Sequence, residues 1–392
     1  MANQTDPYSF AAGRLPTETR QAIRAFWSHF QDHADALDQC FRSNMTDMTT
    51  DPTDVMGALA AVSPDLMWEF GPSDRGHALT ITAEWKDANR PLARAVCMMA
   101  PNLPRWRLYE VRSVEADNID AAEYFAARFR EPLVLTGIDT AVGRTGRIDL
   151  VAHGPAKADT LEDHAIKIAT SILGEEVERD WLGFVDAART PKAGLLGRLR
   201  GQRPVPLDAI AFADSFRAAI ALAKSKMPTT PYSAMSLKDR GMVLVKPSKM
   251  PADHPRSDLL FFVTTSSPYA EAVLLGGRFS SRCYSLHDEW FLYLRIPRSA
   301  DAPFDDVQDR YDIEERLHDA LSKDGLGGMV AAGHGREAVY IDVAVTDVAL
   351  GIERIAGAIQ GEVYAEGATL HFLDEGVQDL VLPAAPELVT LN

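Results

Sequence analysis

The chain of 392 residues is long enough for two to three domains of about 150 residues each. Its 40 lysines and arginines against 56 aspartates and glutamates give a formal net charge of −16, which opposes binding to nucleic acid. No apolar run of about 18 residues is present, and residues 1–20 lack the pattern of a secretion signal, so we expect no membrane contact and a cytoplasmic location. Three cysteines far apart in the sequence, Cys40, Cys97 and Cys283, also fit a reducing compartment.

The first third of the chain predicts the order helix, two strands, helix, strand. Large apolar residues recur at helical spacing after Thr17, and polarity alternates on both sides of a turn rich in glycine and proline. The expected elements are helices at 17–37 and 53–61, strands at 66–70 and 77–82, a helix at 92–99 and a strand at 106–111.

The same order recurs twice, which predicts an α+β fold built from repeated α-ββ-α-β, ferredoxin-like units with helices on one sheet face. The second hairpin strand of the later two copies carries Ile148-Asp149-Leu150 and Ile341-Asp342-Val343, respectively. The second copy has a helix at 119–129, strands at 133–138 and 147–151, a helix at 161–172 and a strand at 181–185; the third has a helix at 307–321, strands at 328–332 and 338–345, a helix at 348–359 and a strand at 368–372.

A segment of three prolines, three glycines and four basic residues, 190–206, is the predicted linker. It separates an N-terminal α+β domain of two units, 1–189, from a C-terminal α+β domain, 207–392. The linker is either an exposed loop or a small anion- or partner-binding patch. Ahead of its repeat unit the C-terminal domain is expected to add a helix at 210–226 and strands at 242–245, 259–264, 272–279 and 290–296.

Four residues are candidates for binding. Because side chains alternate along a strand, Asp149 and Asp342 should lie on the sheet face opposite their aliphatic neighbours. That face either receives a ligand or partner or simply meets water. His334 and Arg336 are expected at an exposed hairpin tip formed by residues 333–336, where they are either solvated or paired for acid–base and anion chemistry.

Catalytic, metal and cofactor motifs are not evident. The glycine-rich segment 325–336 follows a helix and precedes a strand, which is the wrong order for a phosphate-binding loop. His29 and His33 lie four residues apart on the first predicted helix, where they flank the aromatic stripe of Phe26 and Phe30 and are interpreted as its polar border and not as metal ligands. No H-E-x-x-H motif and no G-x-S-x-G elbow is present. Cys283, with Arg282 beside it and His287 four residues on, is the remaining thiolate candidate. We therefore predict no catalytic residue, no metal and no cofactor.

The C-terminal unit resembles the bacterial ribonuclease-activity regulator B family and the domains of unknown function that accompany it. The resemblance covers some 70 residues: the acidic helix 305–323, the glycines of 327–335, Tyr340-Ile341-Asp342-Val343 and the helix 348–359. It implies a ferredoxin-like α+β fold, no cofactor, and a role in binding and restraining another protein.

These observations lead to two functional hypotheses. The first is a cytoplasmic bacterial protein that acts by protein–protein contact, as a regulator or inhibitor, and that does not bind nucleic acid. The alternative is an enzyme of unrecognised type with a pocket between the two halves, to which His334, Arg336 or Cys283 contributes.

Overall fold

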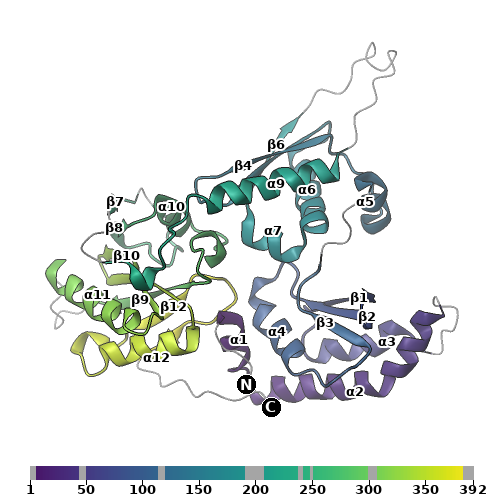
Figure 1. Ribbon diagram of the computed structural model, residues 1–392, viewed down its shortest axis with the longest axis horizontal. Helices are drawn as coiled ribbons and strands as arrows, with labels where there is room; N and C mark the ends of the chain where they lie inside the picture. Colours follow the sequence, from purple (N-terminus) through teal and green to yellow (C-terminus); the bar gives the residue numbers. More distant parts are fainter. Residues whose placement is uncertain are drawn as a thin grey trace, which may run out of the picture.

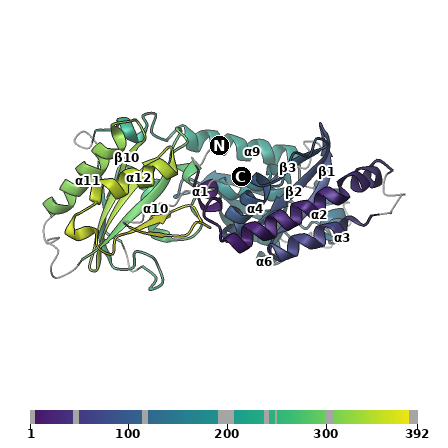
Figure 2. The same cartoon turned by 90° about the horizontal axis from the view of Figure 1, so that it is seen from below.

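The computed structural model describes residues 6–43, 50–113, 120–189, 207–236, 242–247, 250–298 and 307–382. Within these ranges the chain forms helices packed on three β-sheets, as Figures 1 and 2 show, so the predicted α+β class is confirmed. None of the helices described has both the length and the apolar composition required to cross a membrane. The predicted linker, 190–206, lies outside the described residues, and its domain boundaries remain predictions.

The first unit is a three-stranded sheet in the order β1-β2-β3. The hairpin is antiparallel, and β3 returns parallel to β2 after a crossover helix. Ser73 pairs with Gly76, so the turn is two residues long and not the six expected. The elements are α1 (Pro7–Ala12), α2 (Thr17–Arg42), α3 (Pro52–Gly57), β1 (Met67–Ser73), β2 (Gly76–Thr82), α4 (Arg90–Met98) and β3 (Trp106–Tyr109).

The second unit has the same strand order and the same pairing senses, β4-β5-β6. Residues Ile148 and Leu150 of β5 are buried together with apolar residues of α6 and α9, so both helices cover one face of this sheet. The first strand begins four residues later than predicted, and α7 was not predicted. The elements are α5 (Ala121–Phe129), β4 (Gly137–Val142), β5 (Ile148–Gly154), α6 (Ala158–Leu173), α7 (Glu175–Trp181), β6 (Leu182–Arg189) and α9 (Ala209–Lys224).

The C-terminal part forms a seven-stranded sheet in the order β13-β12-β9-β11-β10-β8-β7. Its closing strand β12 pairs with β9, which lies between β11 and β12, so this unit departs from the topology of the first two. The elements are β7 (Val243–Val245), β8 (Leu259–Thr264), α10 (Ser267–Leu275), β9 (Trp290–Pro297), α11 (Val307–Ser322), β10 (Gly327–Gly335), β11 (Ala338–Val345), α12 (Val348–Ile359), β12 (Thr369–Phe372) and β13 (Leu380–Val381).

One predicted strand is wrong. The apolar run in 272–279 was interpreted as a strand, but residues Ser267–Leu275 form the helix α10. The side chain of Ser266 accepts a hydrogen bond from the amide of Tyr269 and caps the helix, and Pro268 lies in the first turn. A short apolar run fits both periodicities, and here the cap and the proline favour the helix.

The buried apolar side chains form three clusters. One belongs to the first unit, where Phe26, Trp27 and Phe30 of α2 pack with residues of the sheet. A second joins the second unit to one face of the C-terminal sheet. The third lies between the opposite face of that sheet and the helices α11 and α12. The sheet β1-β2-β3 and helices α2 to α4 therefore share an apolar core of their own, whereas Phe10 of α1 is buried in the third cluster. Polar groups connect the first sheet to the second unit, for example the hydroxyl of Thr82, which donates to Glu175 at 2.5 Å.

Candidate functional site

Asp342 is not available for binding. Its neighbours Ile341 and Val343 face α12 as predicted, but the face on which Asp342 lies is covered, and its exposed fraction is 0%. Nη1 of Arg256 donates to both carboxylate oxygens at 2.9 and 3.0 Å, and the hydroxyl of Tyr269 donates at 2.6 Å. The expected open polar face at Asp342 is therefore wrong: the carboxylate is part of a buried ion pair.

Asp149 lies on the uncovered face of sheet β4-β5-β6, where Asp139 and Phe184 are largely exposed. It is itself only half-buried and accepts a hydrogen bond of 2.9 Å from the amide of Phe184. This contact lies at an irregularity in the pairing of β5 with β6. Asp149 therefore holds the backbone of β6. It belongs to a different sheet from Asp342 and His334, so the structure does not bring these candidates together.

His334 does not lie at a hairpin tip. It is a half-buried member of β10, and its ring stacks on Phe261 with 5.4 Å between the centroids. Burial, with Arg298 and Arg310 nearby, lowers the pKa of His334. The turn falls two residues later than predicted and brings only Arg336 to the surface. The two side chains thus do not form the exposed pair that was predicted.

The thiol of Cys283 is buried and donates to the backbone oxygen of Asp180 at 3.0 Å. Burial raises its pKa to about 12, so the thiol form is favoured and the thiolate that nucleophilic chemistry needs is not. A cavity of about 400 Å³ does lie between the two halves of the chain, among α1, α4, α7 and residues 282–290. Cys283, His334 and Arg336 are not among the described residues that line it.

A cleft of about 650 Å³ lies between the first sheet and helices α5 and α6. We call it the β1–α6 cleft. Two tryptophans from the first unit, Trp68 and Trp85, face Phe129 and Ile166 of the second unit across it. Met67 and Trp85 are 44% and 48% exposed, respectively, which is high for such large apolar side chains.

Charged groups of both signs hold the walls of the β1–α6 cleft. The Arg112 guanidinium pairs with Glu69 at 3.1 Å and with Glu84, and its amide donates to Glu175 at 2.9 Å. Arg128, whose side chain is 38% exposed, pairs with Glu69 at 3.3 Å. Glu84, which precedes Trp85 in the chain, has a positive φ of 47°, a backbone conformation that is uncommon for residues other than glycine. These contacts connect β1, the end of β2, β3 and α5 in one network.

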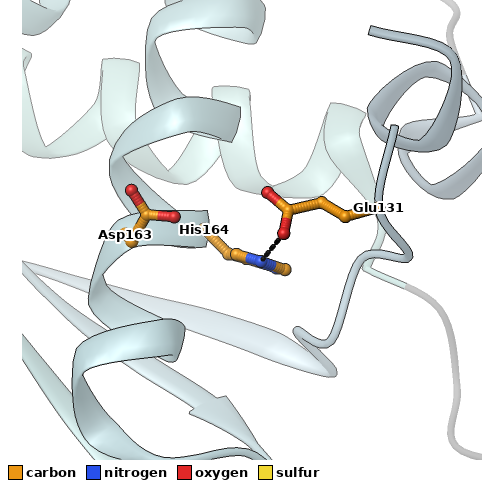
Figure 3. A group of neighbouring side chains, drawn as sticks. All are labelled: Glu131, Asp163 and His164. Atoms are coloured by element: carbon orange, nitrogen blue, oxygen red, sulfur yellow. Dashed lines mark ion pairs between the residues drawn. The ribbon is translucent and has the colours of Figure 1, made fainter. Parts of the chain in front are cut away.

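Three potential metal ligands, Glu131, Asp163 and His164, lie close together (Figure 3), and Asp163 also lines this cleft. The Nζ atom of Lys167 lies between the two carboxylates, 2.9 Å from Glu131 and 2.7 Å from Asp163. Nδ1 of His164 accepts a hydrogen bond of 3.3 Å from the amide of Val134, so Nε2 carries the proton and faces Glu131 at 3.7 Å. The hydrogen bond from Lys167 lowers the pKa of Glu131, and burial lowers that of His164. The ammonium group thus pairs with both carboxylates of this cluster.

The sequence reasoning missed the residues of the β1–α6 cleft. Trp85 could have been noticed, because a tryptophan just beyond the end of a predicted strand does not belong to the alternating apolar pattern of that strand. The arginines gave no such signal. Comparisons with protein-family models, with curated proteins and with solved structures gave no match, so the resemblance to the ribonuclease-activity regulator B family stays a prediction.

Proposed function

We propose that the protein acts by binding another protein, a segment of which occupies the β1–α6 cleft. The exposed Trp85 carries this proposal, together with Met67 and the partly exposed Arg128. Tryptophan, arginine and methionine are enriched at the centres of protein interfaces, where they supply most of the binding free energy. A cleft lined by these residues is typical of such a surface.

The exposure of the cleft residues favours a partner protein over a small molecule. A drug-sized ligand usually has 70–90% of its surface buried in its pocket. Here the side chains of Met67 and Trp85 line an open cleft and are nearly half exposed, so they lie in a surface and not in an enclosed pocket. A chain segment that crosses the cleft would cover them.

The chemistry of the cleft indicates what the partner segment carries. An apolar side chain would fit between Trp68, Trp85 and Phe129, and a neighbouring carboxylate would pair with the exposed donors of Arg128. Arg112 is already held by three carboxylates of this chain, so it fixes the wall and does not need a partner. We therefore propose a segment with a large apolar residue beside an acidic one.

The setting and the effect on the partner extend this proposal. All three cysteines are free thiols, which supports a reducing cytoplasm. The family that the C-terminal unit resembles would make the effect a restraint of the partner, as a regulator or inhibitor. No contact with nucleic acid is proposed, since the net charge of −16 opposes it.

The test is affinity capture from the cytosol of cells that make the protein, with three immobilised forms of the full chain. The forms are the wild type, Trp85→Ala and, as the matched control, Val363→Ala, which shortens a side chain that is 71% exposed and distant in the sequence. We expect one protein to be retained by the wild type and the control and lost from Trp85→Ala. Calorimetry with that protein should give an affinity about 30-fold weaker for Trp85→Ala.

Two outcomes contradict the proposal. One is that no protein is enriched by the wild type over empty beads. The other is a captured protein whose affinity for Trp85→Ala lies within about threefold of the wild-type value. The thermal unfolding midpoints of all three forms must agree, so that a loss of binding is not a loss of fold.

A further inference from the structure

A third cavity, of about 580 Å³, lies on the face of the C-terminal sheet that α11 and α12 do not cover. At its edge three side chains lie in a row, joined by one ion pair and one hydrogen bond. Oδ2 of Asp379 lies 2.6 Å from Nδ1 of His371, and Nε2 of His371 lies 2.7 Å from Oγ1 of Thr369. Thr369 and His371 lie two residues apart on β12 and so share a face, and the hairpin to β13 brings Asp379 back beside them.

The partners of the two imidazole nitrogens of His371 indicate which nitrogen carries a proton. A carboxylate accepts but does not donate, so the 2.6 Å contact with Oδ2 of Asp379 favours the tautomer of His371 that carries its proton on Nδ1. In the neutral imidazole Nε2 is then an acceptor, and the Thr369 hydroxyl donates to it. A hydroxyl on a histidine whose far nitrogen is held by a carboxylate is the arrangement that activates an oxygen nucleophile.

The neighbours of His371 fix its ring. The ring stacks on Tyr293 of β9, with 4.5 Å between the centroids and 6° between the planes. The guanidinium carbon of Arg256, which the buried Asp342 holds, lies 3.9 Å from the same tyrosine ring. Only 17% of the His371 side chain is exposed. The base therefore has little freedom to turn away from Thr369.

The cavity beside Thr369 has both an apolar and a cationic part. Val273, Phe279 and Leu373 are among its lining residues. Arg295 pairs with Thr369 across strands β9 and β12, so its side chain starts on the same sheet face and it also lines the cavity. A cation beside a reacting carbonyl stabilises the negative charge that develops on the oxygen.

From this geometry we propose that the cavity is a hydrolytic site for small carboxylic esters, with Thr369 as nucleophile and His371 as base. It is independent of the β1–α6 cleft. The Thr369 oxygen bonds to the acyl carbon while the hydroxyl proton passes to Nε2 of His371. The bond to the alcohol oxygen then breaks, and that oxygen takes the proton. Water adds to the acyl-threonine, its proton passes to His371 and on to the Thr369 oxygen as it departs, and the free acid leaves.

The walls also define the substrate class. The apolar residues would surround a short acyl chain, and Arg295 would face the carbonyl oxygen. The volume of about 580 Å³ is in the range of small-molecule sites. Asp379 has 53% of its side chain exposed, so it orients the imidazole from the rim and its removal should cost less than that of His371.

The test uses p-nitrophenyl acetate as substrate and a fluorophosphonate as covalent probe on the full chain. We expect hydrolysis by the wild type and a mass increase on the peptide that contains Thr369. Thr369→Val and His371→Gln should lower kcat/KM at least about 100-fold, and Asp379→Asn about 10-fold. Thr369→Ser keeps the hydroxyl and should retain activity within about 10-fold.

The matched control is His153→Gln. His153 also pairs with an aspartate, Asp139, at 2.8 Å, but it lies on the open face of another sheet and should leave hydrolysis unchanged. Absence of both hydrolysis and labelling in the wild type overturns the proposal, as does a label on any other residue. Because the site of labelling is read on the wild type, the result stands even if Thr369→Val fails to fold.

Discussion

Strands β5 and β11 share a local sequence pattern, but the aspartate within that pattern has a different environment in each strand. In β5 and β11 an aspartate stands between two aliphatic residues that face helices, as Ile148-Asp149-Leu150 and Ile341-Asp342-Val343. Asp149 lies half-buried on an open face and holds the amide of Phe184. Asp342 is fully buried and paired with Arg256.

The difference arises from what covers the second face. Arg256 and Tyr269, which enclose Asp342, come from the segment before β8 and from α10, some 86 and 73 residues away in the sequence. The sheet β4-β5-β6 has no such cover on the side of Asp149 among the residues described. Alternation along a strand predicts which side chains share a face, but it does not predict whether that face meets water.

The largest effect is expected at the buried aspartate. Asp342→Ala would leave the guanidinium of Arg256 buried without its counter-ion, so we expect a loss of about 3–5 kcal/mol in the free energy of unfolding. Urea unfolding followed by circular dichroism measures it. Replacing Arg256, Asp342 and Tyr269 together by Met, Leu and Phe should recover most of that loss, because no buried charge or unpaired hydroxyl then remains. A loss below about 1 kcal/mol for Asp342→Ala would show that this face is open after all.

An intermediate effect is expected at Asp374, a buried carboxylate held by serine donors. It accepts hydrogen bonds from the amide and hydroxyl of Ser281, and burial raises its pKa from 3.8 to about 6. The folded state therefore binds its proton more tightly than the unfolded state, and this contribution to stability, present in acid, is lost as the pH rises from about 4 to about 6. The loss is about 3 kcal/mol.

The difference in unfolding free energy between the wild type and Asp374→Asn, measured by urea at several pH values, isolates this group. We expect the difference to fall with rising pH over that interval and to stay constant above pH 7. A difference that does not depend on pH would contradict the raised pKa.

The smallest effect is expected at Asp149. Asp149→Ala removes one hydrogen bond to a backbone amide near the surface, so the loss should be about 0.5–1 kcal/mol. Asp149→Asn keeps an acceptor and should be neutral within about 0.5 kcal/mol. Both values come from the same urea experiment. A loss for Asp149→Ala as large as that for Asp342→Ala would mean that the two strands do not differ in the way described.

The elements with strong periodicity were predictable. The helix after Thr17 and the strand Leu259–Thr264 lie where the pattern predicted them. The errors occur where two periods compete, as in α10, and where glycines suggest a turn, as at Gly333, which pairs with Tyr340 inside the hairpin. The placement of β9 between β11 and β12 was beyond local reasoning, since it depends on a strand that precedes the unit in the chain.

The sites were less predictable than the fold. The alternation of β12 could have placed Thr369 and His371 on one face, but Asp379 reaches them only through a hairpin that the sequence did not indicate. Likewise the residues of the β1–α6 cleft come from two units with separate cores. Sites assembled from distant segments leave little trace in local spacing.

The separation of those cores bears on how the molecule loses its structure. Apolar packing is continuous from the second unit into the C-terminal sheet, whereas polar contacts such as Thr82 to Glu175 connect the first unit to the second. Packed cores unfold cooperatively, so we expect the sheet β1-β2-β3 with α2 to α4 to open at a lower cost than the rest, while Phe10 keeps α1 on the C-terminal core. A partner bound in the β1–α6 cleft would touch both sides of that division. At a concentration 100 times its Kd, the bound partner would raise the free energy of this opening by about 2.7 kcal/mol. The two parts of the molecule would then unfold together as one cooperative unit.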